Sequence, residues 1–587
     1  MSANFDLVIR RGLLVDGSGS PEPRVADVAI RGDRIVEVGT GSGTGHEEID
    51  ANGALVTPGF VDVHTHFDGQ VTWASQLTPS SLHGATTVVG GNCGVGFAPC
   101  RPQDRDLLIR VMEGVEDIPE PVLAKGLQWE WESFPEYLDA IARRHFDIDF
   151  ATQIPHGPVR IYAMGQRGAD REPATPDDLE VMTSIVQGAL KAGALGFSTS
   201  RTMLHRLKDG RLAPTITAGE YELLAIARAM RDVGLGVFQG VDDFSDTAAS
   251  FALWAQLAEV SQRPVSLALN ARNTADDLWQ RRLEQMESVT AGGAGTLRGQ
   301  VICRPIGMLL GLDLSFNPFS LCASWAEIDS LPLPQKITWL RKPEVRARLL
   351  SEPLENGHPA MAAILRRFEH MYVLGDPPNY EPSVDSSLAA QAKTFGRDPL
   401  EHAYDTLLNR DGREILYFPV NNFPGNSFDA IDTMLRNPAT IVGIGDGGAH
   451  QGMICDSSTT TFLLTYWTRD RKGERIPLST AIRMLTRDTA AALGLNDRGL
   501  VAPGYKADIN VIDYDRLHLH APFVVRDLPD NGRRLMQRAD GYVATIKSGQ
   551  ITYREGEFTG ALPGRLVRGA QRSPNDALPN RTIKETL

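Results

Sequence analysis

Apolar and polar residues alternate over residues 1–57, in short runs interrupted by glycine, aspartate and asparagine. Alternation with turn-forming residues between the runs predicts β-hairpins. The far end of the chain repeats this pattern in ADINVIDYDRL (507–517) and GYVATIKSGQITYREGEF (541–558). Two β-rich segments at opposite ends of one chain favour a single small β domain, with the middle of the chain inserted between them.

The middle of the chain alternates short apolar runs with longer segments, several of which are amphipathic helices. Segments 177–193 and 218–234 both end in glycine, the residue that a helix C-terminus prefers, and 246–262 has the same helical pattern. Strands that mostly alternate with helices predict an α/β fold, a (β/α)8 TIM-like barrel. The expected strands lie in LVTPGFVDVHTH, ATTVVGGNC, DIDFATQIPH, ALGFSTS, GLGVFQGV, RPVSLALN, GQVICRP and ATIVGIGDGG.

Residues 305–435 interrupt this alternation, because the segment is long, rich in proline and poorly periodic. We expect an insertion or lid there, together with some helices. The sequence therefore predicts a small β domain (a β-sandwich) from residues 1–57 and 497–560. It also predicts a metal-dependent barrel over 58–496 and a C-terminal extension over 561–587.

The composition is that of an ordinary globular protein, with 42% hydrophobic and 22% charged residues among 587. The net charge of −14 argues against a nucleic-acid or anionic-membrane partner, because both call for a basic face. No apolar run approaches the roughly 18–20 residues that span a bilayer. We expect a small-molecule substrate and no nucleic-acid or membrane partner, and a homo-oligomer remains open.

Five cysteines are spread widely along the chain, and no two of them form a CxxC pair. An odd, widely spaced set makes a disulfide framework improbable. The N-terminal segment lacks the charged and apolar regions of a signal peptide. These features together predict a cytoplasmic protein with reduced thiols.

The stretch GFVDVHTHFDG ends the first strand of the predicted barrel with His64 and His66. Because side chains in a strand repeat with period two, both imidazoles point to the same side. Cys93 ends the next apolar run, and Asp446 ends the last one, which lies beside the first once a barrel closes. Imidazole and thiolate both suit zinc. We therefore predict a metal site made of His64, His66, Cys93 and Asp446.

Such a site has a clear chemical use, although each residue also has an ordinary structural interpretation. Zinc lowers the pKa of a bound water to about 7, and Asp446 would take the proton of that water and return it to a leaving amine. A histidine pair can instead be structural, Cys93 can be a small buried apolar residue, and Asp446 can cap a helix or a turn. Their joint position at strand ends favours the site.

Several motifs resemble the amidohydrolase superfamily and, more narrowly, its N-acyl-D-amino-acid deacylase (D-aminoacylase) branch. The motifs are GALVTPGFVDVHTHFD, GATTVVGGNCGVGFAP, GALGFSTS, IVGIGDGGAH and LTRDTAAALGLNDRGLVAPGYKADINVID. The resemblance covers about residues 5–555. It implies a zinc-dependent barrel that hydrolyses amide bonds. In it His64 and His66 match the metal histidines of strand one, Cys93 matches the metal-ligating cysteine, and Asp446 matches the metal-bound catalytic aspartate.

Two positions depart from the pattern of that branch, which places a histidine at the ends of strands five and six. The matching residues here are Gln239 and Asn270, and amides are poor zinc ligands compared with imidazole. We therefore expect one metal ion in preference to two. The ion is zinc or another divalent metal. Gln239 and Asn270 could instead donate hydrogen bonds to a substrate carbonyl.

The substrate is the least constrained part of the prediction. Arg272 takes the place of the basic residue that holds the substrate carboxylate in the deacylases, and an arginine fork suits a carboxylate, although a solvated surface arginine is the alternative. His156, at another strand end, is a further candidate for substrate binding. The expected substrate is an N-acyl (D-)amino acid or a similar carboxylate-bearing amide. A cyclic amide or lactam, a peptide, an ester, and a non-catalytic binding protein stay open as alternatives.

Overall fold

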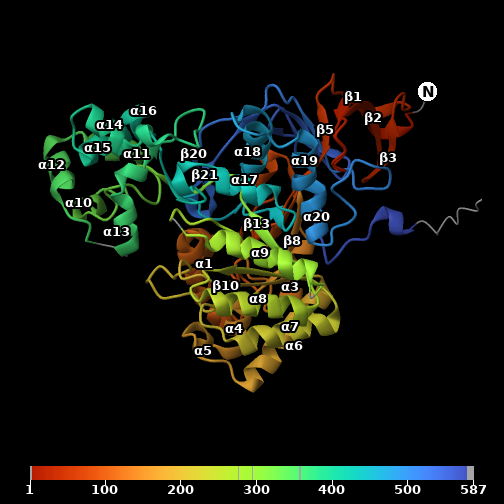
Figure 1. Cartoon of the computed structure of the whole chain (residues 1–587), viewed down its shortest axis with the longest axis horizontal. Coiled ribbons are helices and arrows are strands. Elements are labelled where there is room, and N and C mark those ends of the chain that lie inside the picture. Colours follow the sequence, from red (N-terminus) through yellow and green to blue (C-terminus); the bar gives the residue numbers. More distant parts are fainter. Residues whose placement is uncertain (1–2, 275, 294, 356–358, 578–587) are drawn as a thin grey trace, which may run out of the picture.

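The computed structural model describes residues 3–577 except 275, 294 and 356–358. The chain has an α/β fold in three visible parts (Figure 1). Helices surround a set of parallel strands in the lower half of the view, strands from the two ends of the chain lie at the upper right, and a helical lobe stands out at the upper left. The predicted α/β class is confirmed, and so is the joining of the terminal strands in one mixed sheet.

Strands from both chain ends form one nine-stranded mixed sheet. The N-terminal and C-terminal strands meet where Leu55–Pro58 pairs antiparallel with Ile509–Ile512. Apolar side chains of both ends share one core, in which Ile9 and Ile509 are fully buried. In spatial order the strands are β25 (Glu557–Phe558), β24 (Gln550–Arg554), β23 (Tyr542–Lys547), β18 (Ile509–Ile512), β5 (Leu55–Pro58), β1 (Phe5–Leu14), β2 (Arg24–Arg31) and β3 (Arg34–Gly39), with β4 (Gly45–Asp50) on β1.

Parallel strands in the middle of the chain pair in sequence order within two sheets. The first sheet is β6 (Phe60–Asp62), β7 (Ala85–Gly90) and β8 (Asp149–Thr152). The second is β9 (Ile154–Pro155), β10 (Gly196–Arg201), β11 (Val237–Asp242), β12 (Val265–Ala268), β13 (Leu297–Val301) and β17 (Thr440–Val442). The segment after β17 returns to the segment after β6, because the Asp446 N–H donates to the His64 carbonyl (3.0 Å) and the His66 N–H to the Gly447 carbonyl (2.7 Å). The ends of the first and last strands therefore lie side by side.

Amphipathic helices connect these strands and cover their outer side, as the sequence pattern predicts. The helix α6 (Pro176–Ala192) starts at a capping box in which Thr175 accepts from the Asp178 N–H, and it ends at Gly193 with φ 114°. A β-carbon is disfavoured at that φ, which explains the glycine. The other helices that precede the lobe in sequence are α1 (Arg105–Glu116), α2 (Glu120–Gly126), α3 (Phe134–Ala142), α4 (His156–Met164), α5 (Gln166–Ala169), α7 (Glu220–Val233), α8 (Thr247–Ser261) and α9 (Leu278–Ala291).

Between β13 and β17 the chain leaves the parallel strands and forms the lobe at the upper left of Figure 1. Its strand β14 (Ile306–Leu310) pairs antiparallel with β16 (Leu416–Asn421), and β15 (Tyr372–Val373) pairs with β16 on the other side. Leu310, Leu349 and Leu388 belong to a hydrophobic core that is separate from the core of the parallel strands. The segment that breaks the sequence pattern therefore packs around a core of its own. Its helices include α10 (Ala323–Ala326), α11 (Leu333–Leu340), α12 (Pro343–Ser351), α14 (Leu388–Thr394) and α15 (Pro399–Leu407).

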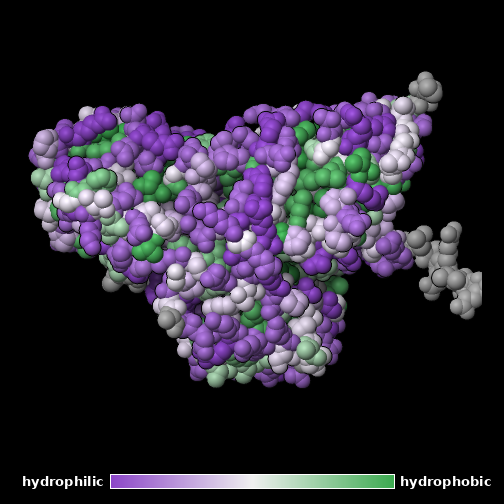
Figure 2. All heavy atoms as spheres, turned by 45° about the horizontal axis from the view of Figure 1, so that its top comes forward, coloured by the Kyte–Doolittle hydropathy of each residue, from purple (hydrophilic) through white to green (hydrophobic). Residues whose placement is uncertain are grey.

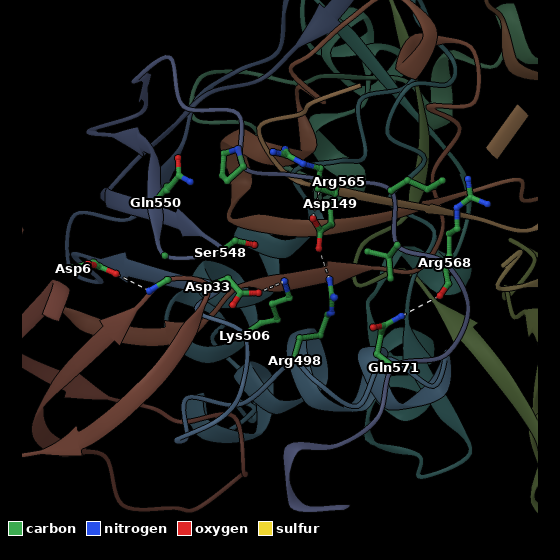
Figure 3. Close-up of a pocket in the computed structure, with 15 residues that line it drawn as sticks. Asp6, Asp33, Asp149, Arg498, Lys506, Ser548, Gln550, Arg565, Arg568 and Gln571 are labelled. Carbon is green, nitrogen blue, oxygen red and sulfur yellow. Dashed lines mark hydrogen bonds and ion pairs between the residues drawn. The ribbon is translucent and has the colours of Figure 1, made fainter. Parts of the chain in front are cut away.

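The segment after the terminal sheet covers the amino ends of the parallel strands. The Phe150 N–H donates to the Arg565 carbonyl (3.1 Å), next to a pocket of about 640 Å³. Figure 3 shows Arg498 and Asp149 pointing toward each other in this pocket, at an ion-pair distance of 2.8 Å. Lys547 pairs with Asp149 (2.7 Å) and with Asp508 (2.8 Å). We call Asp149, Arg498, Lys547 and Asp508 the floor network, a buried cluster in which every charge has a partner.

The surface and the cysteines agree with the sequence analysis. Figure 2 shows a mainly hydrophilic face on which hydrophobic residues form smaller, separate patches. Among the helices of the described residues, none combines the length and the apolar character that crossing a bilayer requires. All five cysteines are buried and free.

Candidate metal centre

The structure brings together the four side chains that the sequence predicts as metal ligands. The Nε2 atom of His64 lies 3.3 Å from the Cys93 sulfur and 3.5 Å from Oδ1 of Asp446. The Nε2 atom of His66 lies 3.7 Å from the same Asp446 oxygen. Donor atoms of His64, His66 and Cys93 all lie within 4.8 Å of one another. We call these four side chains the metal cluster.

The opposite ring nitrogen of each histidine faces an oxygen outside the metal cluster. Nδ1 of His64 is 2.7 Å from Oε1 of Gln300. Nδ1 of His66 is 3.4 Å from Oε1 of Glu116, the last residue of α1. Both Nε2 atoms are thus left for the centre of the cluster.

The electrostatics of this region fit a bound cation. The carboxyl groups of Asp62, Asp68 and Glu116 are buried and that of Asp446 is partly buried, with 13% of its side chain exposed. In the described part of the chain no lysine or arginine forms an ion pair with any of the four. Burial raises the pKa of Asp62 and of Asp68 to about 7. Burial likewise raises the pKa of Asp446 well above its usual range and lowers the pKa of His64 to about 4. Buried anionic groups need a partner, and thiolate, imidazole and carboxylate are donors for a divalent metal ion.

Four residues at or near the metal cluster have a strained backbone. Cys93 (φ 56°), Ile444 (φ 61°), Asp446 (φ 47°) and His450 (φ 49°) all adopt the left-handed conformation that favours glycine. For a β-branched residue such as Ile444 this conformation is a clear outlier. Strained residues of this kind persist where the surroundings fix them, and they gather at functional sites. The loops after β7 and β17 are therefore built to aim Cys93 and Asp446 into the cluster.

The metal cluster opens into a cavity of about 810 Å³ at the carboxyl ends of the parallel strands. Arg272 and Arg282 line it, and their guanidinium groups both donate to the Asp243 carbonyl, at 2.7 and 3.1 Å. Neither arginine forms an ion pair with any carboxylate of the described residues. Arg282 is 5% exposed and stacks over the Phe244 ring at 3.9 Å. Burial and the charge of Arg272 lower the pKa of Arg282 to about 10.

Two predicted substrate-binding residues do not reach this cavity. The side-chain oxygen of Gln239 accepts from the Cys93 N–H (3.2 Å), so the amide lies behind the cluster. His156 is fully buried, with Nδ1 2.8 Å from Thr199 Oγ1 and Nε2 2.7 Å from Oε1 of Glu222. Both side chains are committed to bonds within the protein, which corrects the expectation that they face a substrate. Asn270 does line the cavity.

Apolar residues occupy the part of the cavity that faces strands β11 and β12. Val241 and Ala268 line the cavity from these strands. They pack with Ile302 and Ile444 in one small hydrophobic cluster. None of these four side chains can bind a metal ion, although Asp242 and Asp243 at the end of β11 also line the cavity.

Sequence reasoning missed two residues at the metal cluster and undervalued a third. Glu116 lies at the end of a helix and Gln300 lies inside a strand, whereas the site residues were predicted from the ends of strands. His450 is not among the predicted site residues, yet it lines the cavity with Nε2 3.6 Å from Oε2 of Glu116. Its place four residues after Asp446, in GIGDGGAH, was an available signal.

Comparison with known proteins defines the class. Residues 47–553 match the amidohydrolase family. The chain belongs to this family and is a hydrolase that acts on carbon–nitrogen bonds.

Within that class the chain resembles deacylases of N-acyl-D-amino acids. It is 25% identical to a D-aminoacylase of Alcaligenes xylosoxydans xylosoxydans, over 96% of this chain and 98% of the relative. It is also 25% identical to an N-acyl-D-aspartate deacylase of the same organism, over 98% and 97% of the two chains. A crystal structure of D-aminoacylase superposes with a TM-score of 0.63 at 22% identity, covering 96% of this chain and all of the other.

Proposed function

We propose that this amidohydrolase removes the acyl group from an N-acyl-D-amino acid, with one zinc ion held by His64, His66, Cys93 and Asp446. The observation that carries the proposal is the convergence of these four side chains at a cavity that Arg272 and Arg282 also line, neither of them ion-paired to a carboxylate of the described residues. The D-aminoacylase and the N-acyl-D-aspartate deacylase that this chain resembles along nearly its whole length support the substrate class.

The fold that we propose for this enzyme is a (β/α)8 barrel over residues 58–496, with a β-sandwich built from 1–57 and 497–560. The pairing order of the parallel strands and the hydrogen bonds that join the segments after β6 and β17 support the barrel. A likeness to D-aminoacylase structures supports the same architecture. The lobe within 305–435 is then the insertion that covers the mouth of the barrel.

The residues of the cluster have separate tasks in this reaction. A zinc ion would supply Lewis acidity and an activated water. Asp446 lies within 3.7 Å of both histidines, which places it to accept a proton from the attacking water and to return it to the leaving amine. The Asn270 amide lines the cavity and can donate a hydrogen bond to the substrate carbonyl. One ion is preferred to two, because Gln239 and Asn270 stand where related enzymes have histidines and amides are poor zinc ligands.

The rest of the cavity fits an amphipathic substrate. Arg272 and Arg282 would bind the carboxylate, because a guanidinium fork matches its two oxygens. The apolar part of the substrate would lie against the wall that the lobe provides, which includes Met308, Phe316 and Ile364. A substrate with a charged end and an apolar acyl group fills both regions.

The test is a substrate panel run on purified protein of known metal content. N-acyl-D-amino acids should be hydrolysed faster than their L enantiomers and faster than N-acyl amines that lack the carboxylate. A chelator should abolish the activity, and zinc should restore it. Hydrolysis of cyclic amides, peptides or esters alone would contradict the proposed substrate and favour that alternative. Less than about 0.1 equivalents of metal, with no hydrolysis after zinc, nickel or manganese is added, would favour a binding protein, because the reaction needs a metal-activated water.

A further inference from the structure

We propose that Gln300 and Glu116 are positioning residues that fix how His64 and His66 present themselves to the metal ion. Nothing in the comparisons assigns these two residues a role, and the proposal rests on the proposed metal centre. Each of the two holds an oxygen against the Nδ1 atom of one metal histidine, which leaves Nε2 facing the cluster. A metal ion needs the lone pair of one ring nitrogen, and the bond made by the other nitrogen decides which one is available.

Gln300 is held in the orientation that this role requires. Its side chain is 2% exposed, and its Nε2 donates to Oγ of Ser266 (3.0 Å). The amide oxygen therefore points to Nδ1 of His64 at 2.7 Å. An amide oxygen can only accept, so Nδ1 of His64 must carry the proton and Nε2 must be free of it. Ser266 and Gln300 on adjacent strands thus set the tautomer of a histidine on a third.

Glu116 occupies the corresponding place beside His66. Its side chain is 1% exposed, and its oxygens lie 3.4 Å from Nδ1 of His66 and 3.6 Å from Nε2 of His450. Within the described residues no hydrogen bond satisfies this buried Nδ1 atom of His66, and the Glu116 oxygen at 3.4 Å is close enough to become its acceptor after a small movement. The His450 N–H donates to the Glu116 carbonyl, which ties the end of α1 to the loop that carries Asp446.

This arrangement has a measurable consequence for metal binding. A carboxylate or amide oxygen behind a metal histidine fixes the ring and raises its basicity. Loss of such a partner typically lowers metal affinity 10- to 100-fold. Loss of a buried hydrogen-bond acceptor elsewhere in the core should lower the free energy of unfolding without lowering the metal affinity.

The experiment compares zinc affinities, measured by competition with a chromophoric chelator, after the metal has been stripped from the intact protein. Gln300→Met and Glu116→Met keep the side-chain length and remove the acceptor, and each should weaken zinc binding about 10- to 100-fold. Gln300→Glu and Glu116→Gln keep an acceptor oxygen and should stay within a few-fold of the parent. Gln537→Met is the matched control, because Gln537 is a fully buried glutamine hydrogen-bonded to Ser458 and to the His520 carbonyl, away from the cluster.

A second measurement determines the histidine tautomer directly. Nitrogen-15 NMR of the stripped parent should show His64 as the Nδ1–H tautomer, and this signature should be lost in Gln300→Met. Zinc binding within twofold of the parent in both methionine variants, an equal loss in Gln537→Met, or an Nε2–H tautomer of His64 would overturn the proposal. A parent that binds no zinc would instead overturn the metal centre itself, so the two failures are distinguishable.

Discussion

The two ends of the parallel strands hold buried charge in opposite ways. In the floor network Arg498 and Lys547 lie between Asp149 and Asp508, and each charge has an opposite partner within 2.8 Å. At the metal cluster, the buried Glu116 and the partly buried Asp446 have only histidines within ion-pair distance among the described residues. The first region is complete as it stands. The second is complete only when a cation is added.

The pKa values express the same difference. Burial alone would raise the pKa of Asp149, but Lys547 and Arg498 lower it to about 2. Burial raises the pKa of Asp446 well above its usual range, with no opposing base. A perturbed carboxyl is therefore not by itself evidence of function. For these two carboxyls the difference lies in the neighbours, since two bases pair with Asp149 and only histidines lie within ion-pair distance of Asp446 among the described residues.

The largest expected effect comes from the metal cluster. Asp446→Asn should lower kcat by about 100- to 10,000-fold, the usual contribution of general acid–base catalysis. Steady-state kinetics at saturating zinc measure it. The control is Glu113→Gln, since Glu113 lines the same cavity but pairs with Lys208 (2.7 Å), and its kcat should change only a few-fold. If kcat of Asp446→Asn were close to that of the parent, the assignment of proton transfer to Asp446 would be contradicted.

The second effect belongs to the floor network. Arg498→Met leaves Asp149 with Lys547 alone and takes the arginine partner from the buried Asp497, which lies 2.9 Å from Arg498. It should lower the free energy of unfolding by about 3–5 kcal/mol. Urea denaturation of the zinc-free protein measures this loss, while zinc affinity should stay unchanged. Arg554→Met removes an exposed ion pair with Glu47 and should cost about 1 kcal/mol or less. A zinc affinity that falls with Arg498→Met would show that the two ends are coupled.

A third effect tests the substrate end of the cavity. Arg272→Met should lower kcat/KM for an N-acyl amino acid about 10- to 100-fold, because a hydrogen bond to a charged group is worth about 1.5–3 kcal/mol. An N-acyl amine without the carboxylate should be hydrolysed equally by parent and variant. An equal loss on both substrates would mean that Arg272 acts through the structure and not on the carboxylate.

The smallest effect is the pH dependence of the floor network. The folded pKa of Asp149, about 2, lies below the usual value of 3.8. Its contribution to stability is therefore fully present above about pH 4 and is lost as the pH falls toward 2, by about 2 kcal/mol. Denaturation of the zinc-free protein at several pH values measures the slope. Asp149→Asn should have a shallower slope over this range, and an unchanged slope would contradict the assignment.

The sequence could predict the fold class and much of the site because both follow from periodicity. Strand period two places His64 and His66 on one side, and the closing of the strand set brings Asp446 beside them. Periodicity does not predict how far along a strand a residue lies, and so which residue of one face reaches the cavity. Gln239 and Val241 point to the same side of β11, but Val241 lies nearer the carboxyl end and takes the position at the cavity.

The remaining residues of the site could not be predicted for a different reason. Glu116 reaches His66 from the end of a helix, and Gln300 reaches His64 from within a strand. Such contacts join elements that are distant in the chain, and no local pattern marks them. The left-handed conformation of Ile444 is likewise imposed by tertiary packing against the preference of the residue itself.

The pairing of β5 with β18 has a consequence for how the chain is made. The ribosome must synthesise everything between Pro58 and Ile509 before these strands can meet. At 5–20 residues per second this takes roughly half a minute to a minute and a half. For that time the apolar face of the N-terminal hairpins lacks its native cover. We therefore expect a chaperone that shields nascent β-structure to raise the yield of folded protein. A substitution that only stabilises the finished fold should raise it less.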